Sequence, residues 1–281
     1  KYFTDLGWKL KNQTLFDRVV KSSSSSAKLN FLALKEKQSI AELKKISRGE
    51  FRKRKVFCLR GGYGNLRLID LLDEAELEKK KKLEIWGYSD TTILQHEFFI
   101  RYGWPWVHSP MLAGLKQDLP KKMQSKWPKA GGEKEFQFDL KLLYNTRHET
   151  IPQSALLLGG NLVSLVSWLA CRPKVKLSKE YFLFLEDIQE SGYQIDRALV
   201  QLRSHPFFKN CRGIILGHFT NCPQYEEVLE NFAKEENKLL LSKLPVGHED
   251  PNLPIAMGRK VDLKKVTSKK FSLKVPNPLY E

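Results

Sequence analysis

Residues 83–90 read Leu-Glu-Ile-Trp-Gly-Tyr-Ser-Asp, and the fold of the first half of the chain depends on this stretch. Its apolar beginning predicts a short buried strand, and the spacing of Ile93, Leu94 and Phe98 predicts a helix directly after it. Ser89 therefore lies where a strand turns into a helix. Such a turn presents a hydroxyl outward, while the amides at the helix N-terminus point at a developing oxyanion.

The match of this turn to the nucleophile-elbow motif G-x-S-x-G is partial. Gly87 and Ser89 fit the motif, but Thr91 stands where the second glycine belongs. A serine in this position is more often a simple helix cap than a nucleophile, so the motif alone leaves both alternatives open.

A second strand–turn–helix pattern precedes it. The apolar run at 56–59 is closed by Arg-Gly-Gly-Tyr-Gly at 60–64. Two such units predict a parallel sheet whose turns meet at one edge. The loop does not fit a dinucleotide site, because Arg67 stands where the third glycine would fall. It is either a tight turn or a source of backbone amide donors beside Ser89.

The second half of the chain offers two carboxylates and one histidine for a hydrolytic site. Glu186 and Asp187 end an apolar run at the rim of a predicted buried strand, where they form either a site or a helix cap. His248 lies in the glycine-flanked loop 245–248, either as a surface residue or reaching into a cleft. The chain order Ser89, Glu186, His248 is that of nucleophile, orienting acid and base in α/β-hydrolases.

Composition divides the chain into domains at 1–115 and 151–281, joined by a polar connecting segment or lid at 116–150 that lacks sustained periodicity. In the second domain Asn161 is expected to cap a helix. The other elements expected there are buried strands at 181–185 and 213–216 and a helix with Ile195, Leu199 and Leu202 on one face.

The balance of 48 Lys and Arg against 32 Asp and Glu gives a net charge of +16. This charge indicates either a polyanionic partner or a solvated surface, and no nucleic-acid-binding motif accompanies it. The four cysteines are expected to be buried thiols, and no H-E-x-x-H motif predicts zinc. No membrane span or export signal is seen. We therefore expect a cytoplasmic protein, with a periplasmic location left open because the sequence begins at Lys1.

Several motifs, taken together and in order, resemble the LD-carboxypeptidase family of serine peptidases, which also contains the microcin C self-immunity proteins. They extend over about residues 56–261 and are jointly specific. The matching residues are 58–64, 87–90, 108–111, 158–162, 184–187, 193–197, 213–219 and 245–248, with Asn252, Pro254 and Gly258.

The resemblance implies that Ser89 is the nucleophile, His248 the general base and acid, and Glu186 the group that orients the imidazole. It also implies that the amides of Gly62 and Asp90 are the oxyanion donors. In the family the reaction removes the terminal D-alanine from murein tetrapeptides, by cleaving its bond to the L-centre of the preceding diamino acid, during cell-wall recycling. That diamino acid is either lysine or diaminopimelate, and no metal or cofactor is needed.

The expected fold is α/β. A parallel-sheet domain of Rossmann or flavodoxin-like type is followed by a smaller C-terminal α/β swivelling domain, with the active site at their junction and segment 116–150 as its gate. Arg60 is a candidate for binding the terminal carboxylate of the substrate by position only. The resemblance further implies a homodimer.

The chain departs from the family pattern in several places. The family's first strand, G-D-x-ϕ-x-ϕ-x-A-P-[AS] with ϕ apolar, has no match here. Residues 108–110 read His-Ser-Pro instead of His-Gly-Pro, and Glu249 and Asp250 replace the glycine that usually follows the histidine. Extra carboxylates beside His248 would favour its protonated form.

Two other functions compete with this one. The first is hydrolysis of an aminoacyl-nucleotide antibiotic, as in the immunity branch, with Trp127 as a candidate platform for the base. The second is non-catalytic binding of an anionic polymer by the positive charge, with an affinity that falls steeply with salt.

Overall fold

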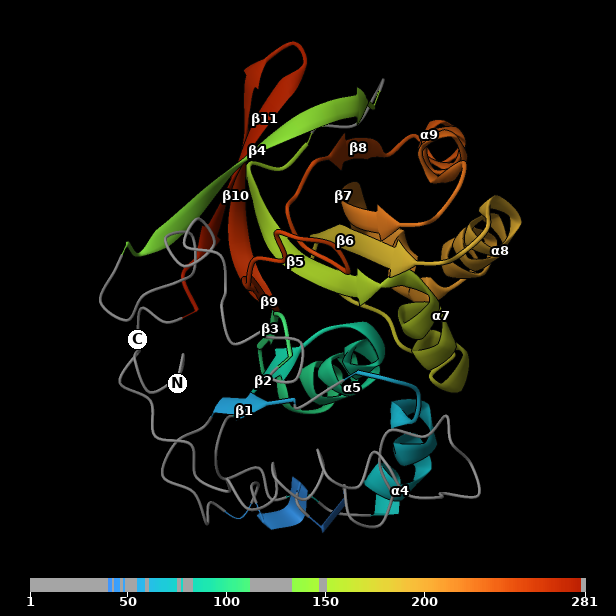
Figure 1. Cartoon of the computed structure of the whole chain (residues 1–281), viewed down its shortest axis with the longest axis vertical. Coiled ribbons are helices and arrows are strands. Elements are labelled where there is room, and N and C mark those ends of the chain that lie inside the picture. Colours follow the sequence, from blue (N-terminus) through green and yellow to red (C-terminus); the bar gives the residue numbers. More distant parts are fainter. Residues whose placement is uncertain are drawn as a thin grey trace.

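The protein has a mixed α/β fold in two parts, each built on its own sheet (Figure 1). The computed structural model describes residues 40–41, 43–45, 48, 55–58, 61–74, 77, 83–111, 133–146 and 151–278. Arg60, Trp127 and residues 116–132 and 147–150 of the expected connecting segment lie outside the described residues. What was expected of them stays a prediction.

The first part carries a sheet in the order β1-β2-β3-β9. Its first three strands pair in parallel, as predicted, whereas β9 runs antiparallel to β3 and comes from far along the chain. A Rossmann or flavodoxin-like order stays a prediction. The elements are β1 (Lys55–Phe57), η1 (Asn65–Leu68), α4 (Ile69–Glu74), β2 (Glu84–Gly87), η2 (Ser89–Thr91), α5 (Thr92–Tyr102), β3 (Trp106–His108) and β9 (Ile255–Met257).

The second part is a closed barrel in the order β10-β11-β4-β8-β7-β6-β5, which the sequence did not predict. Strands β5 to β8 are parallel neighbours joined through α7, α8 and α9, which lie together on one side, with β4, β10 and β11 on the other (Figure 1). The elements are β4 (Glu135–Tyr144), β5 (Ser154–Asn161), α7 (Leu162–Cys171), β6 (Tyr181–Ile188), α8 (Gly192–Arg203), η4 (Pro206–Asn210), β7 (Cys211–Thr220), α9 (Tyr225–Glu235), β8 (Leu239–Ser242), β10 (Arg259–Thr267) and β11 (Lys270–Pro276).

Strand β4 corrects the expectation for the segment 116–150. Residues 135–144 are a barrel strand that pairs with β11 and β8, not part of a connection or lid. Phe136, Phe138, Leu140 and Leu142 alternate with more exposed polar residues along it, as they must in a strand with one face toward a core.

Several expected elements of the barrel domain are confirmed. Asn161 caps α7, since its Oδ1 accepts a hydrogen bond from the amide of Ser164 at 3.0 Å. Ile195, Leu199 and Leu202 are fully buried along one face of α8. No helix within the described ranges is long and apolar enough to cross a membrane.

The two parts meet where the helix that follows the serine turn rests on the end of β5. A Cβ atom built on Gly160 would come within 2.6 Å of Thr92 Oγ1, so only a glycine allows this approach. The same hydroxyl accepts a hydrogen bond from the amide of Asn161 at 3.2 Å. The start of α5 is therefore fixed directly against the barrel.

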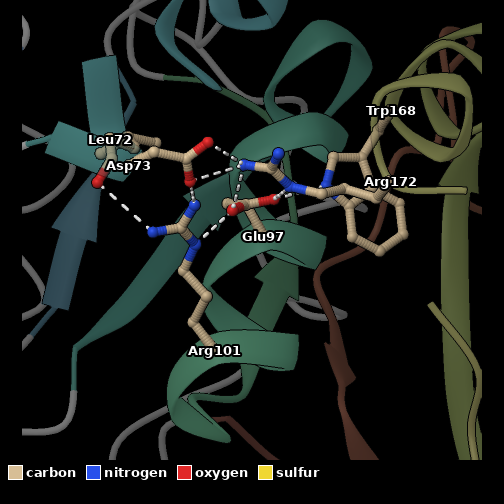
Figure 2. Close-up of polar contacts among 6 residues, drawn as sticks. All are labelled: Leu72, Asp73, Glu97, Arg101, Trp168 and Arg172. Atoms are coloured by element: carbon tan, nitrogen blue, oxygen red, sulfur yellow. Dashed lines mark hydrogen bonds and ion pairs between the residues drawn. The ribbon is translucent and has the colours of Figure 1, made fainter. Parts of the chain in front are cut away.

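A buried carboxylate joins the parts a second time, further along α5 (Figure 2). Glu97 accepts hydrogen bonds from Trp168 Nε1 of α7 at 2.7 Å and from Nε of Arg172, the residue that follows α7, at 3.1 Å. Arg101 of α5 also pairs with Glu97, and both arginines pair with Asp73 of α4. The cluster around this buried carboxylate thus connects α4, α5 and the end of α7.

We expect Glu97→Gln to lower the free energy of unfolding by about 2–4 kcal/mol, because it leaves two arginines and the Trp168 indole with a weaker, uncharged acceptor. The measurement is urea unfolding. The matched control is Glu235→Gln, the same change in the exposed pair with Arg203, which should cost less than about 1 kcal/mol. Equal losses in the two variants would show that the buried cluster does not stabilise the junction.

Candidate active site

Ser89 begins η2, two residues beyond the last residue of β2, and has a φ of 62°. A positive φ in a residue other than glycine is strained and often marks a functional turn. The turn is tight, since a Cβ on Gly87 would lie 2.9 Å from Thr91 Oγ1 and 3.0 Å from the Cβ of Cys58. Thr91 fits where the nucleophile-elbow motif has its second glycine, because its hydroxyl donates to the Tyr88 carbonyl at 2.9 Å.

The glycine loop after β1 lies beside this turn, as expected. A Cβ atom built on Gly61 would lie 3.7 Å from the Cβ atom of Ser89. The next residue, Gly62, has a φ of 108°. The buried Asp90 carboxylate accepts a hydrogen bond from the amide of Asn65 at 2.8 Å, so it ties the loop to the serine turn. Burial raises the pKa of Asp90, against the hydrogen bonds from the loop, which lower it. The oxyanion roles of the Gly62 and Asp90 amides stay predictions.

Glu186 and His248 come together from β6 and from the loop after β8. The imidazole Nδ1 and Glu186 Oε2 are 2.6 Å apart. Glu186 is fully buried, and 11% of the His248 side chain is exposed. Gly247 allows the contact, since its φ is 135° and a Cβ there would lie 3.2 Å from the Cβ of Glu186. The Gly247 amide donates to Asn252 Oδ1 at 3.1 Å, which holds the loop in place.

The histidine also reaches the serine turn of the other part. The rings of His248 and Tyr88, the residue before Ser89, have centroids 4.7 Å apart. The structure therefore gathers the serine turn, the histidine and the Glu186 carboxylate at the junction of the two sheets. The transfer of a proton from Ser89 to His248 stays a prediction.

The electrostatics of His248 follow from its neighbours. Burial lowers the pKa of its imidazole, but the hydrogen bond with Glu186 and the charges of Glu186 and Asp187 outweigh burial and raise it above 6.5. Burial and the charges of Glu186 and Asp250 raise the pKa of the adjacent Tyr88. The carboxylates that raise the pKa of His248 are therefore the two of β6, and the expected effect of Glu249 and Asp250 stays a prediction.

Of the two adjacent carboxylates of β6, one lies against His248 and the other caps a helix. Glu186 faces His248, whereas Asp187 accepts hydrogen bonds from Asn161 Nδ2 at 2.7 Å and from the Val163 amide at 3.0 Å. Asp187 thus completes the N-terminus of α7. Burial and the charge of Glu186 raise its pKa to about 6 despite these hydrogen bonds.

His108, at the end of β3, is a residue of this region to which the sequence assigned no role. It is fully buried, and its Nε2 lies 3.9 Å from Glu186 Oε1. Burial, with the charges of His248 and His96, lowers its pKa to about 3. The sequence signal was its place in the motif at 108–111.

The described part of the chain contains neither a cluster of candidate metal ligands nor a disulfide. No group of three or more His, Cys, Asp or Glu side chains there could hold a metal ion, and the cysteines are free thiols. Cys171 corrects the expectation of buried thiols, because it lies exposed at the end of α7.

Comparisons with known proteins define the class. The LD-carboxypeptidase N-terminal domain matches residues 1–109, and the LD-carboxypeptidase C-terminal domain matches residues 154–263. A probable murein peptide carboxypeptidase of Bacillus subtilis is 31% identical over 243 residues, which cover 82% of this chain and 74% of that protein. The murein tetrapeptide carboxypeptidase of Pseudomonas aeruginosa is 29% identical and covers 70% of this chain and 68% of its own length.

Solved structures share the fold. The muramoyltetrapeptide carboxypeptidase of Oxalobacter formigenes matches with a TM-score of 0.69 at 21% identity, over 95% of both chains. A structure of MccF in complex with glutamyl sulfamoyl guanosine matches with a TM-score of 0.69 at 18% identity, over 95% of this chain and 91% of that one. Fold and relatives together define a carboxypeptidase with a two-domain mixed α/β architecture. The chain belongs to the LD-carboxypeptidase family.

Proposed function

We propose that the protein is a serine LD-carboxypeptidase that removes the terminal D-alanine from murein tetrapeptides. The observation that carries the proposal is the 2.6 Å contact between His248 and Glu186, packed against the tyrosine that precedes Ser89. Relatives named for murein peptides align over both parts of the chain. The active site is then shared between the two domains.

The chemistry follows the serine hydrolase scheme. Ser89 Oγ attacks the carbonyl carbon of the diamino acid, and His248 Nε2 takes the hydroxyl proton. The amides of Gly62 and Asp90 stabilise the oxyanion of the tetrahedral intermediate. His248 then gives the proton to the nitrogen of D-alanine, and the C–N bond breaks. Water, deprotonated by His248, hydrolyses the acyl-enzyme and restores Ser89.

Glu186 fixes the direction of the imidazole in this scheme. Because Nδ1 is bound to Glu186 Oε2, Nε2 is the ring nitrogen available to the serine. The buried carboxylate also stabilises the imidazolium that forms when the proton is taken. Arg60 remains the proposed partner of the terminal carboxylate of the substrate.

A second candidate, hydrolysis of aminoacyl-nucleotide antibiotics, is favoured by the fold shared with the MccF complex. The experiment is a rate comparison of the wild-type protein on a murein tetrapeptide and on glutamyl sulfamoyl guanosine. We expect turnover of the tetrapeptide. Faster turnover of the nucleotide would assign the protein to the immunity branch. If neither substrate is turned over, non-catalytic binding of an anionic polymer is the remaining alternative.

The activity should depend on pH through His248. Only the neutral imidazole accepts the serine proton, so kcat/KM is expected to fall about tenfold per pH unit below the pKa of His248. Because that pKa is raised, the midpoint should lie above 6.5. A pH–rate profile of kcat/KM with the tetrapeptide checks this. A midpoint below 6.5 would mean that Glu186 does not hold the imidazole during catalysis.

The location and oligomeric state belong to the same proposal. A role in cell-wall recycling fits a cytoplasmic protein, and the family resemblance fits a homodimer. Cell fractionation and light scattering test the two statements.

A further inference from the structure

Three buried polar atoms of His108 and Glu186 have no hydrogen-bond partner among the described residues. They are both ring nitrogens of His108 and Glu186 Oε1. His108 Nε2 and Glu186 Oε1 are 3.9 Å apart. Buried polar groups are nearly always paired, so three unpaired atoms beside a catalytic group need an explanation.

The gap between these two atoms is too long for a hydrogen bond, but about 1 Å of side-chain movement would close it. Catalytic hydrogen bonds are often long in unliganded enzymes and shorten when substrate binds. The His108 ring is already directed by its neighbours. Its centroid lies 5.0 Å from that of Phe184 and 5.9 Å from that of Tyr88, both in edge contacts.

The protonation state of His108 allows its ring to act as a hydrogen-bond donor. His108 is neutral near pH 7, because burial and the charges of His248 and His96 depress its pKa, so one ring nitrogen carries hydrogen. The nearby carboxylate can only accept. The tautomer with hydrogen on Nε2 is therefore favoured, since it places N–H toward Glu186 Oε1.

We propose that His108 is a positioning residue that donates a hydrogen bond from Nε2 to Glu186 Oε1 in the reacting enzyme. The orienting carboxylate is then held at both oxygens, by His248 at Oε2 and by His108 at Oε1. It cannot rotate away when His248 becomes an imidazolium. This inference rests on the proposed function, because it assigns a role within that site.

The experiment compares His108→Phe, which removes the donor but keeps a flat ring, with His108→Gln, whose amide can donate in its place. We expect kcat on the murein tetrapeptide to fall about 10- to 100-fold in the first variant, with KM nearly unchanged. The glutamine should recover most of the loss. The matched control is His96→Phe, another fully buried histidine, which bonds the Thr92 carbonyl and should leave kcat unchanged.

A second measurement requires no variant. Nitrogen-15 NMR of the imidazole rings in the wild-type protein should show His108 with hydrogen on Nε2 and a bare Nδ1. Hydrogen on Nδ1 would overturn the inference. So would a wild-type kcat in His108→Phe, or equal losses in the phenylalanine and glutamine variants. If the wild-type protein releases no alanine, the proposed function fails instead. The NMR spectrum still tests which ring nitrogen of His108 carries hydrogen.

Discussion

The Ser89→Ala variant is expected to release D-alanine from a murein tetrapeptide with a kcat about 10⁴- to 10⁶-fold below that of the wild-type protein. The alanine lacks the hydroxyl that forms the acyl-enzyme in the proposed mechanism. The residual rate would come from the oxyanion donors and substrate binding alone. Alanine and serine both carry a single unbranched Cβ, so the positive φ of Ser89 strains the two residues to a similar degree. The variant should therefore fold and bind substrate normally.

Ser109→Ala is the control for this loss. Ser109 follows the neighbouring strand β3, is fully buried, and donates its hydroxyl to the Pro110 carbonyl at 3.3 Å. Its replacement should leave the rate within about twofold, since one neutral hydrogen bond is lost away from the reacting atoms. Steady-state kinetics of both variants, with urea unfolding alongside, make the comparison. Comparable rates for Ser89→Ala and the wild-type protein would show that the nucleophile is another residue.

The second large effect is expected for Glu186→Gln, with a fall in kcat of about 10³- to 10⁴-fold. The glutamine keeps the volume of the side chain but provides no negative charge for the imidazolium. If its amide nitrogen faces His248, it also holds the wrong tautomer of the ring. The residual activity should titrate at lower pH than in the wild-type protein. Without the charge and acceptor of Glu186, burial has the larger effect on the pKa of His248 and lowers it.

Asp187→Asn is the matched control, one residue further along β6. It removes a carboxylate whose hydrogen bonds go to Asn161 and Val163 at the start of α7. We expect a loss of stability of about 1 kcal/mol and a change in kcat below about tenfold. Similar losses of activity in the two variants would mean that general negative charge, rather than the bond to His248, supports the reaction.

The sequence predicted the features that residues close together in the chain determine. The turn at 83–90 needs a buried strand, a glycine and a helix start, and all of these are contiguous in the chain. Asn161 was expected to cap α7 because its amide reaches the next turn of the same helix. The proximity of Glu186 to His248 is different, because it brings together β6 and the distant loop after β8. It was expected from the chain order of the candidate residues and from the family resemblance, not from a local pattern.

The remaining features depend on pairing between distant segments. Barrel closure requires β5 to pair with β10, about a hundred residues later, and nothing local in either strand specifies that partner. The alternation in β4 was present in the sequence, but the prolines, glycines and charges around it indicated a connection. For His108 the sequence offered its place in the motif at 108–111 but no role, because the group it faces, Glu186, lies on a strand of the other sheet.

The most direct test of the central claim uses two tetrapeptides that differ only in the configuration of the last alanine. Mass spectrometry should show that the wild-type protein removes alanine from the peptide that ends in D-alanine and leaves the L-alanine form intact. Removal from both at equal rates, or from neither, would contradict the assignment of this protein as an LD-carboxypeptidase acting on murein peptides.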